Sequence, residues 1–323
     1  MKTYAYYPGC SLETMARSYH CSAVETARVL GLELQEIQDW NCCGATAYFH
    51  IDELLAYTLC ARTLAIAERT GLDLVAPCAG CFKNLHSAAD ALRKDPDLAE
   101  HINEALAEDD LHLSGTTRVR HLIEVFVEDV GLEAIRARVT RSLRGLRVAP
   151  YYGCQVVRPQ KTGEAAERVT FFEDLISALG ATAVPYPARL RCCGGSLIAT
   201  QREAALALVH DLLKSAVEQK AQVVATLCPL CQTNLEAYQG LVRRAYPDLP
   251  AVPVLYFTQV MGLALGISPR RLGIGRELVS AAQVVQFCRR GTAADSEHAP
   301  GEAARAGQAG EEGSRPLAAG RMR

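Results

Sequence analysis

Ten of the thirteen cysteines in this chain of 323 residues occur in two copies of one pattern. Each copy holds a lone cysteine, an adjacent Cys-Cys pair followed by glycine, and a Cys-x-x-Cys, and the separation from the pair to the Cys-x-x-Cys is identical in both. The first set is Cys10, Cys42, Cys43, Cys78 and Cys81. The second set is Cys154, Cys192, Cys193, Cys228 and Cys231. Such clustering makes the ten thiols candidate metal ligands or catalytic groups.

The adjacent pairs favour metal binding over disulfides. Neighbouring cysteines have Cα atoms only about 3.8 Å apart across a trans peptide, which is too close for a relaxed disulfide. Both can instead face one metal centre. Gly44 and Gly194 follow the pairs directly. Glycine there allows a tight turn with positive φ, or a close approach of the backbone to a bulky ligand.

The number of cysteines in each set bears on the metal. A structural zinc site is closed by four ligands, so zinc leaves one cysteine over in each set. An iron–sulfur cluster is also normally held by four thiolates. Five therefore favour an opened iron–sulfur cluster, in which one cysteine of the adjacent pair bridges iron atoms and the other is a terminal ligand. Zinc remains the alternative at this point.

Other cysteines and histidines do not follow the duplication. Cys21, Cys60 and Cys288 fall outside it, and isolated thiols are commonly small buried apolar groups, so no function is assigned to them. His20 and His50 lie near the first set but have no counterpart in the second. We expect these two histidines to be exposed or to cap helices.

Composition narrows the class of protein. The formal net charge is −2 and 49% of the residues are hydrophobic, which does not support a nucleic-acid or anionic-membrane partner. The N-terminal residues lack the apolar core of a signal peptide, and no apolar run approaches the roughly 18 residues that span a bilayer. We therefore predict a cytoplasmic protein without a membrane span, in which disulfides are rare.

Strands and helices are predicted to alternate in both copies, which indicates parallel α/β sheets. The first copy has predicted strands over 2–7, 34–38 and 74–76 and helices over 14–30 and 52–70. The second has strands over 146–152, 183–186 and 222–227 and helices over 171–179 and 201–218. A further strand and helix close each copy, over 118–125 and 252–260. Because open α/β sheets bind ligands outside the carboxyl ends of their strands, each set of cysteines should gather there.

The duplication predicts two domains, over 1–144 and 145–290, in agreement with the size at which single cores tend to split. Beyond about residue 290 the chain is rich in Gly, Ala, Glu, Arg and Ser without apolar periodicity. Such a segment cannot bury enough apolar surface to become ordered, so 291–323 is predicted to be a disordered tail.

The residues around the cysteines resemble the two CCG domains in the B subunit of heterodisulfide reductase, over nearly all of the chain up to about residue 267. The segments that carry the resemblance are Tyr-Pro-Gly-Cys-Ser-Leu-Glu at 7–13, Asp-Trp-Asn-Cys-Cys-Gly-Ala-Thr at 39–46, Cys-Gly-Gly-Ser-Leu at 193–197, Cys-Pro-Leu-Cys-Gln-Thr-Asn-Leu at 228–235 and Pro-Val-Leu-Tyr-Phe-Thr-Gln at 253–259. It implies two pseudo-twofold-related Rossmann-like domains with parallel sheets. It also implies that each set of five cysteines binds one noncubane 4Fe–4S cluster.

The resemblance further implies a catalytic subunit that cleaves or forms a disulfide held between two clusters, each of which captures one sulfur. The chain has no Cys-x-x-Cys-x-x-Cys run of the ferredoxin type. Electrons are therefore expected from two other chains of such complexes, the flavin-containing A subunit plus the ferredoxin-like C subunit. Related chains include glycolate oxidase iron–sulfur subunits, thiol:fumarate reductase subunits and paralogues in sulfur-oxidising bacteria. The alternatives are therefore a subunit that acts on a sulfane or carrier-bound sulfur, and a non-catalytic electron-transfer subunit.

Overall fold

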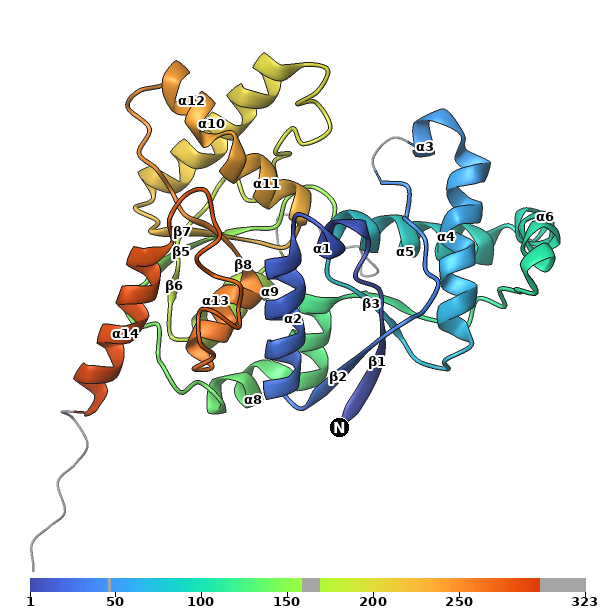
Figure 1. Cartoon of the computed structure of the whole chain (residues 1–323), viewed down its shortest axis with the longest axis horizontal. Helices are drawn as coiled ribbons and strands as arrows, with labels where there is room; N and C mark the ends of the chain where they lie inside the picture. Colours follow the sequence, from blue (N-terminus) through green and yellow to red (C-terminus); the bar gives the residue numbers. More distant parts are fainter. Residues whose placement is uncertain (46–47, 159–168, 297–323) are drawn as a thin grey trace, which may run out of the picture.

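Two four-stranded parallel sheets form the centre of the computed structural model, which describes residues 1–45, 48–158 and 169–296 (Figure 1). The first sheet has the order β2-β1-β3-β4 and is built from β1 (Lys2–Tyr6), β2 (Leu32–Glu36), β3 (Leu74–Ala76) and β4 (Val119–His121). The second has the order β6-β5-β7-β8 and is built from β5 (Arg147–Tyr151), β6 (Thr182–Ala183), β7 (Val223–Thr226) and β8 (Val254–Tyr256). The matching orders confirm the predicted α/β class and its pseudo-twofold repeat.

Helices connect the parallel strands, as crossover connections in such sheets require. Those of the first half are α1 (Cys10–Glu13), α2 (Arg17–Val29), α3 (Tyr48–Ile51), α4 (Glu53–Glu68), α5 (Ala79–Lys94), α6 (Pro96–Leu106), α7 (Leu122–Glu124), a π-helix (Val125–Gly131) and α8 (Leu132–Ala137). Those of the second half are α9 (Phe171–Ala178), α10 (Arg202–Glu218), α11 (Pro229–Ala237), α12 (Gln239–Ala245), α13 (Phe257–Ala264) and α14 (Ala282–Ser296). The inner strands β3 and β7 are buried along their whole length, which explains their continuous apolar sequences.

Four elements differ from the sequence prediction. The strand predicted over 34–38 lies two residues earlier, at Leu32–Glu36. The helix predicted over 14–30 is α2, which begins only at Arg17, and it is preceded by a short helix that was not predicted, α1, which starts at Cys10 after Gly9 with φ of 71°. The strand predicted over 183–186 ends at Ala183, since Pro185 and Pro187 have no N–H to donate to a ladder. Helix α14 continues past residue 290 to Ser296. The remainder of the predicted tail, 297–323, lies outside the described residues.

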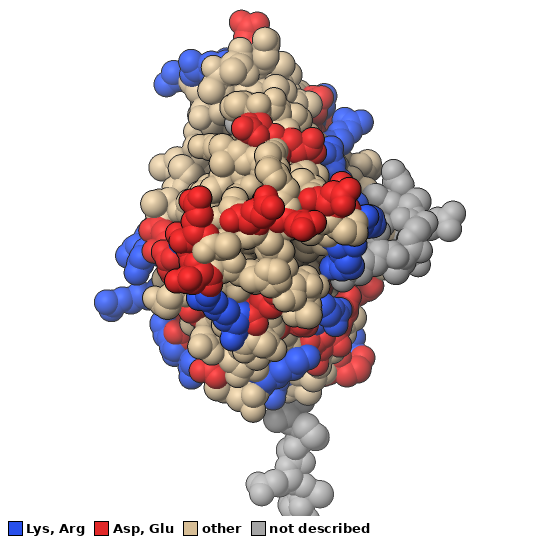
Figure 2. Space-filling model, turned by 90° about the vertical axis from the view of Figure 1, so that its right-hand side faces the viewer, with Lys and Arg blue, Asp and Glu red and all other residues tan. Residues whose placement is uncertain are grey.

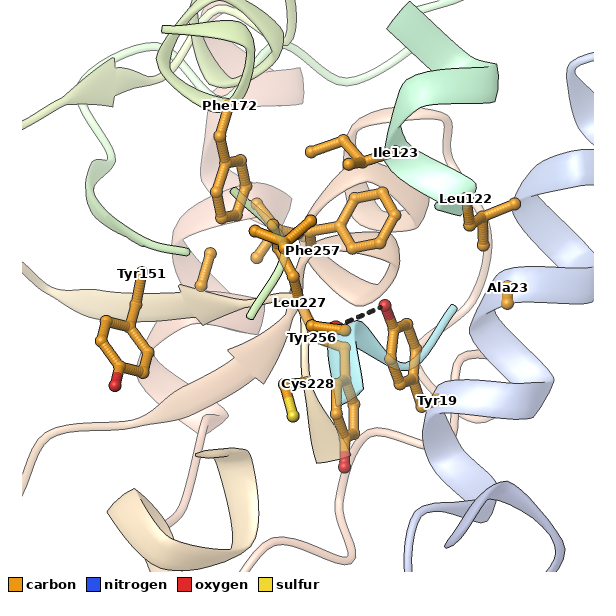
Figure 3. Close-up of a cluster of buried hydrophobic side chains, with 14 of the residues drawn as sticks. Tyr19, Ala23, Leu122, Ile123, Tyr151, Phe172, Leu227, Cys228, Tyr256 and Phe257 are labelled. Carbon is orange, nitrogen blue, oxygen red and sulfur yellow. Dashed lines mark hydrogen bonds between the residues drawn. The ribbon is translucent and has the colours of Figure 1, made fainter. Parts of the chain in front are cut away.

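The two halves share an apolar interface in which α2 packs against α13. Its centre contains Tyr19 from α2, whose ring stacks on that of Tyr256 with centroids 4.1 Å apart (Figure 3). The Tyr19 hydroxyl donates to the Pro77 carbonyl at 2.8 Å in its own half and to the Leu227 carbonyl at 3.3 Å in the other. These carbonyls directly precede Cys78 and Cys228. The interface therefore ties together the two peptides that lead into the Cys-x-x-Cys motifs.

None of the helices in the described ranges is long and apolar enough to cross a membrane.

Candidate metal centres

The three parts of each cysteine set meet at the carboxyl edge of a sheet. In the first half, β1 leads to Cys10 at the start of α1, and β3 leads to Cys78, the N-cap residue of α5. In the second half, β7 likewise leads to Cys228, the N-cap residue of α11. The adjacent pairs lie in segments without helix or strand, at 41–44 and 192–194. The structure thus brings together all five members of each predicted set.

Within each set the sulfur atoms approach in pairs. In the first set, Cys42 Sγ lies 3.8 Å from Cys10 Sγ, and Cys43 Sγ lies 3.3 Å from Cys81 Sγ. In the second, the sulfur atoms of Cys193 and Cys231 are 3.5 Å apart. Cys192 and Cys154 interact in the same way as their counterparts in the first half. The first cysteine of each pair therefore faces the lone cysteine, and the second faces the last cysteine of the Cys-x-x-Cys.

The two sets also meet each other. Cys78 and Cys228 lie beside one another across the boundary between the halves, where Cys228 is the largest cause of the raised pKa of the Cys78 thiol. The pKa of Cys228 is lowered, first by its interaction with Cys231 and then by that with Cys78. Both thiols are buried, at 8% and 5% exposure. The ten cysteines therefore form one continuous group rather than two separate sites.

The group has a closed inner side and an open outer side. Cys10, Cys42 and Cys192 are exposed and Cys154 is half-buried. The six cysteines on the inner side are buried: Cys43, Cys78, Cys81, Cys193, Cys228 and Cys231. A molecule that approaches from solvent would reach the lone cysteine and the first cysteine of each pair.

The exposed cysteines of the pairs have lowered pKa values, as does the buried Cys228. The pKa of Cys42 is lowered chiefly by hydrogen bonds from Cys10 and Cys43, against the opposing effect of burial, with a further contribution from the Gly44 N–H. The pKa of Cys192 is lowered in the same way by Cys154 and Cys193, and the Gly194 N–H lies 3.3 Å from its sulfur. Thiolates, rather than thiols, are the metal-ligating form of cysteine, so these two positions are prepared for ligation.

Two glycines leave space beside the sulfur atoms. A Cβ built on Gly9 would lie 3.1 Å from Cys81 Sγ, and one on Gly153 would lie 3.2 Å from Cys231 Sγ. Both glycines have positive φ, 71° and 70°. A bulky group that is bound by five thiolates needs this close approach of the backbone, so the residues present fit an iron–sulfur cluster. In the described part of the chain, no three His, Cys, Asp or Glu side chains are placed so that they could hold a single metal ion.

Residues outside the duplication have structural contacts. Cys60 is fully buried and its thiol donates to the Cys43 carbonyl at 3.5 Å, while Cys288 is buried and Cys21 is half-buried. His50 is exposed, as expected. His20 is half-buried instead, with Nδ1 3.3 Å from the Tyr6 hydroxyl, because β1 and α2 pack together there.

Sequence reasoning missed His121, which lies at the carboxyl end of β4 in the interface between the halves. Burial lowers its pKa to about 4, and the nearby Leu227 carbonyl opposes that shift. Its Nδ1 accepts from the Ile123 N–H at 3.2 Å, so the imidazole is neutral with its proton on Nε2. A single histidine outside the cysteine pattern gave no signal for this position.

The outer surface carries both signs of charge. On the face that includes α4 and α6, acidic and basic side chains are interspersed (Figure 2). Near the first set, four large apolar side chains of α3 and the start of α4 are exposed: Tyr48 (45%), Ile51 (79%), Leu54 (42%) and Leu55 (43%). We refer to these four residues as the apolar rim.

Comparison with known proteins agrees with the duplicated site. The family model described as a cysteine-rich domain, CCG, matches residues 4–86 and 148–236. The B subunit of the ferredoxin/F420H2-dependent CoB-CoM heterodisulfide reductase of Methanosarcina acetivorans is 31% identical over 264 residues, which cover 80% of this chain and 86% of that protein. The chain belongs to the B-subunit family of heterodisulfide reductases.

A further relative is named for a different reaction. The 8-methylmenaquinol:fumarate reductase membrane anchor subunit of Wolinella succinogenes is 35% identical over 285 residues, which cover 88% of this chain and 99% of that protein. Among solved structures, a hypothetical protein from Helicobacter pylori is similar, with a TM-score of 0.70 at 15% identity. That match covers 87% of this chain and 52% of the other, and it bears on the fold alone.

Proposed function

We propose that this chain is the catalytic subunit of a heterodisulfide reductase-type complex, with one noncubane 4Fe–4S cluster bound by each set of five cysteines. The observation that carries the proposal is the meeting of two complete sets at Cys78 and Cys228. Two such clusters at one interface would each supply one electron to a disulfide or related sulfur substrate. The overall change is RSSR + 2e⁻ + 2H⁺ → 2RSH, or its reverse.

The chain's own residues support this role in two ways. The exposed cysteines of both halves, Cys10, Cys42 and Cys192, form the side from which a sulfur substrate would approach. The buried cysteines and the Tyr19 contacts hold the two halves in a fixed relation on the opposite side. We propose that electrons come from two partner chains, one ferredoxin-like and one flavin-containing, since relatives are named as subunits of such reductases. We also propose a location in the cytoplasm, because clustered cysteines that serve as metal ligands are typical of a reducing compartment.

A second candidate is a quinol-linked subunit that rests on a membrane surface. It is favoured by the relative named as a membrane anchor of a methylmenaquinol:fumarate reductase. The apolar rim, next to the segment that carries Cys42 and Cys43, is a surface that could lie against lipid. In this case the same cysteines would hold redox centres that exchange electrons with a lipophilic quinol.

Iron analysis and single-cysteine variants test the leading proposal. Anaerobically prepared protein should contain about eight irons and eight acid-labile sulfides per chain if each set holds a four-iron cluster. Cys193→Ala should abolish disulfide reduction by a low-potential artificial donor, although the first set can still assemble its cluster. Cys43→Ala should also abolish disulfide reduction, although the second set can still assemble its cluster. Electron paramagnetic resonance establishes in each variant that the other cluster survives.

Several outcomes would reject this proposal. Zinc in place of iron, or four irons per chain, contradicts two clusters, and robust turnover by either variant means that one half is an electron conduit. Oxidation of a menaquinol analogue by the wild-type protein, without disulfide reduction, would select the second candidate. In that case Ile51→Glu should also weaken flotation of the protein with liposomes.

A further inference from the structure

The backbone of each adjacent cysteine pair is held by side chains from elsewhere in the same half. The segments 41–44 and 192–194 have no helix or strand, so their carbonyls need other donors. The Tyr7 hydroxyl donates to the carbonyl of Asn41, which precedes the first pair, at 2.8 Å. The Tyr151 hydroxyl donates to the carbonyl of Arg191, which precedes the second pair, at 2.7 Å. Both tyrosines lie three positions before the lone cysteine of their set.

A second donor holds the other end of each pair. Asn84 Nδ2 donates to the Cys43 carbonyl at 3.1 Å, and Asn234 Nδ2 donates to the Cys193 carbonyl. Both asparagines come from the helix that the Cys-x-x-Cys begins, three residues after its last cysteine. They are buried, with 5% and 1% of their surface exposed. The contacts are therefore repeated in both halves although each is made by residues far apart in sequence.

We propose that Tyr7 with Asn84, and Tyr151 with Asn234, are positioning residues that orient the adjacent cysteines for cluster binding; this inference rests on the proposed function. Fixing the carbonyls before and at the end of a pair restricts its peptide planes. With these peptides held, the two thiols of a pair keep separate directions. This is observed: Cys42 faces Cys10, and Cys43 faces Cys81.

The four side chains are uncharged donors. The pKa of Tyr7 is raised by burial and by the neighbouring Cys81 and Cys43, and that of Tyr151 by burial and then by Cys231 and Cys193. Carboxamides do not titrate, and their N–H groups can satisfy a carbonyl without adding charge next to the sulfur atoms.

The duplication allows each half to serve as the internal control for the other. Tyr7→Phe or Asn84→Leu should weaken the first cluster only, and Tyr151→Phe or Asn234→Leu the second only. Release of iron to a ferrous chelator should become biphasic, with half of the iron lost about fivefold faster, as expected for one lost hydrogen bond. The electron paramagnetic resonance signal of the affected cluster should change as well. Tyr→Phe removes a single oxygen atom, so it serves if an asparagine variant does not fold.

Two variants separate positioning from general stability. Tyr4→Phe removes the hydroxyl that contacts Asp129, and Gln239→Leu removes the buried amide that donates to the Val252 carbonyl at 2.7 Å. Both substitutions remove a hydrogen bond that does not involve the cysteine pairs. They should lower the free energy of unfolding, but iron release should stay monophasic at the wild-type rate. Equal acceleration in these controls, or wild-type kinetics in all four positioning variants, would overturn the inference. A wild-type protein that binds no iron would instead reject the proposed function itself.

Discussion

His121 shows how a single residue can be sensitive to pH in this molecule. Its imidazole is fully buried between the halves, near the carbonyls of Pro77 and Leu227. These carbonyls offset only part of the cost that burial imposes on a positive charge there. Burial consequently lowers the pKa of His121 to about 4, below its usual value of 6.5. The neutral ring packs edge-on against Phe82, at a centroid distance of 5.7 Å.

This lowered pKa makes stability depend on pH in a defined direction. Between pH 6.5 and 4 the unfolded chain binds a proton at His121 that the folded chain does not, so the free energy of unfolding should fall as pH falls. The loss between pH 7.5 and 5.5 should be roughly 1 kcal/mol. Urea denaturation of wild type and His121→Phe at both pH values measures the difference. An identical pH dependence in the two proteins would contradict the neutral buried assignment.

At the scale of elements, the glycines that follow the cysteine pairs determine how closely these turns can pack against neighbouring helices. Gly44 and Gly194 have φ of 69° and 71°, in the left-handed region that costs other residues about 1–2 kcal/mol. At Gly194 a Cβ would also lie 3.1 Å from the Ala205 Cα of α10. That contact is with backbone, so it cannot be relieved by a rotamer change. The turn therefore depends on glycine for two separate reasons.

Gly194→Ala should lower the free energy of unfolding by more than the backbone conformation alone requires. Gly71→Ala is the matched control, since Gly71 has φ of 68° and a Cβ there would meet nothing within 4 Å. We expect a loss of about 1 kcal/mol at Gly71 and roughly 3 kcal/mol at Gly194. Chemical denaturation measures both values. Equal losses would mean that α10 moves away freely, and the close-approach argument would then be wrong.

At the scale of the whole molecule, polar contacts join the two halves at the centre of an apolar interface. In addition to the Tyr19 hydroxyl, Ser22 and Thr258 share a buried hydrogen bond of 2.6 Å between α2 and α13. At the surface, Arg271 forms an ion pair with Glu25 on α2. Buried polar groups must be paired with correct geometry, so these contacts specify one relative placement of the halves.

Tyr19→Phe should loosen that placement. The change leaves the Pro77 and Leu227 carbonyls without the shared hydroxyl donor, at an expected cost of about 2 kcal/mol in the free energy of unfolding. Tyr6→Phe is the control, because the Tyr6 hydroxyl contacts His20 within one half. If Tyr19→Phe is no more costly than Tyr6→Phe in urea denaturation, the interface does not depend on this hydroxyl.

We expect helix α14, which follows the last strand of the second sheet, to contribute to the stability of the folded protein. In α14, Val284 and Cys288 are buried at 2% exposure, and Phe287 lies against Gly145 at the start of the second half. A chain that ends at 281 should lose roughly 3 kcal/mol in thermal or chemical unfolding, from burial of these side chains. A chain that ends at 296 keeps the whole helix and should match the full-length protein. Equal stability of the two shortened chains would show that α14 contributes no packing.

The sequence alone was sufficient for the family, the α/β class and the two cysteine sets. The sets were readable because spacing between Cys42, Cys43, Cys78 and Cys81 is a local property that recurs in the second half. Strand and helix positions followed from apolar periodicity, except where prolines shortened β6 and where Gly9 started α1 at Cys10. The ligand role of the cysteines and the domain boundaries stay predictions.

Only the tertiary structure decided how the two sets are related. The contact of Cys78 with Cys228, the shared hydroxyl of Tyr19 and the buried His121 all depend on the packing of α2 against α13. That packing is set by the shapes of apolar surfaces on two helices far apart in the chain. Periodicity shows which face of a helix is apolar, but it carries no information about which other face covers it.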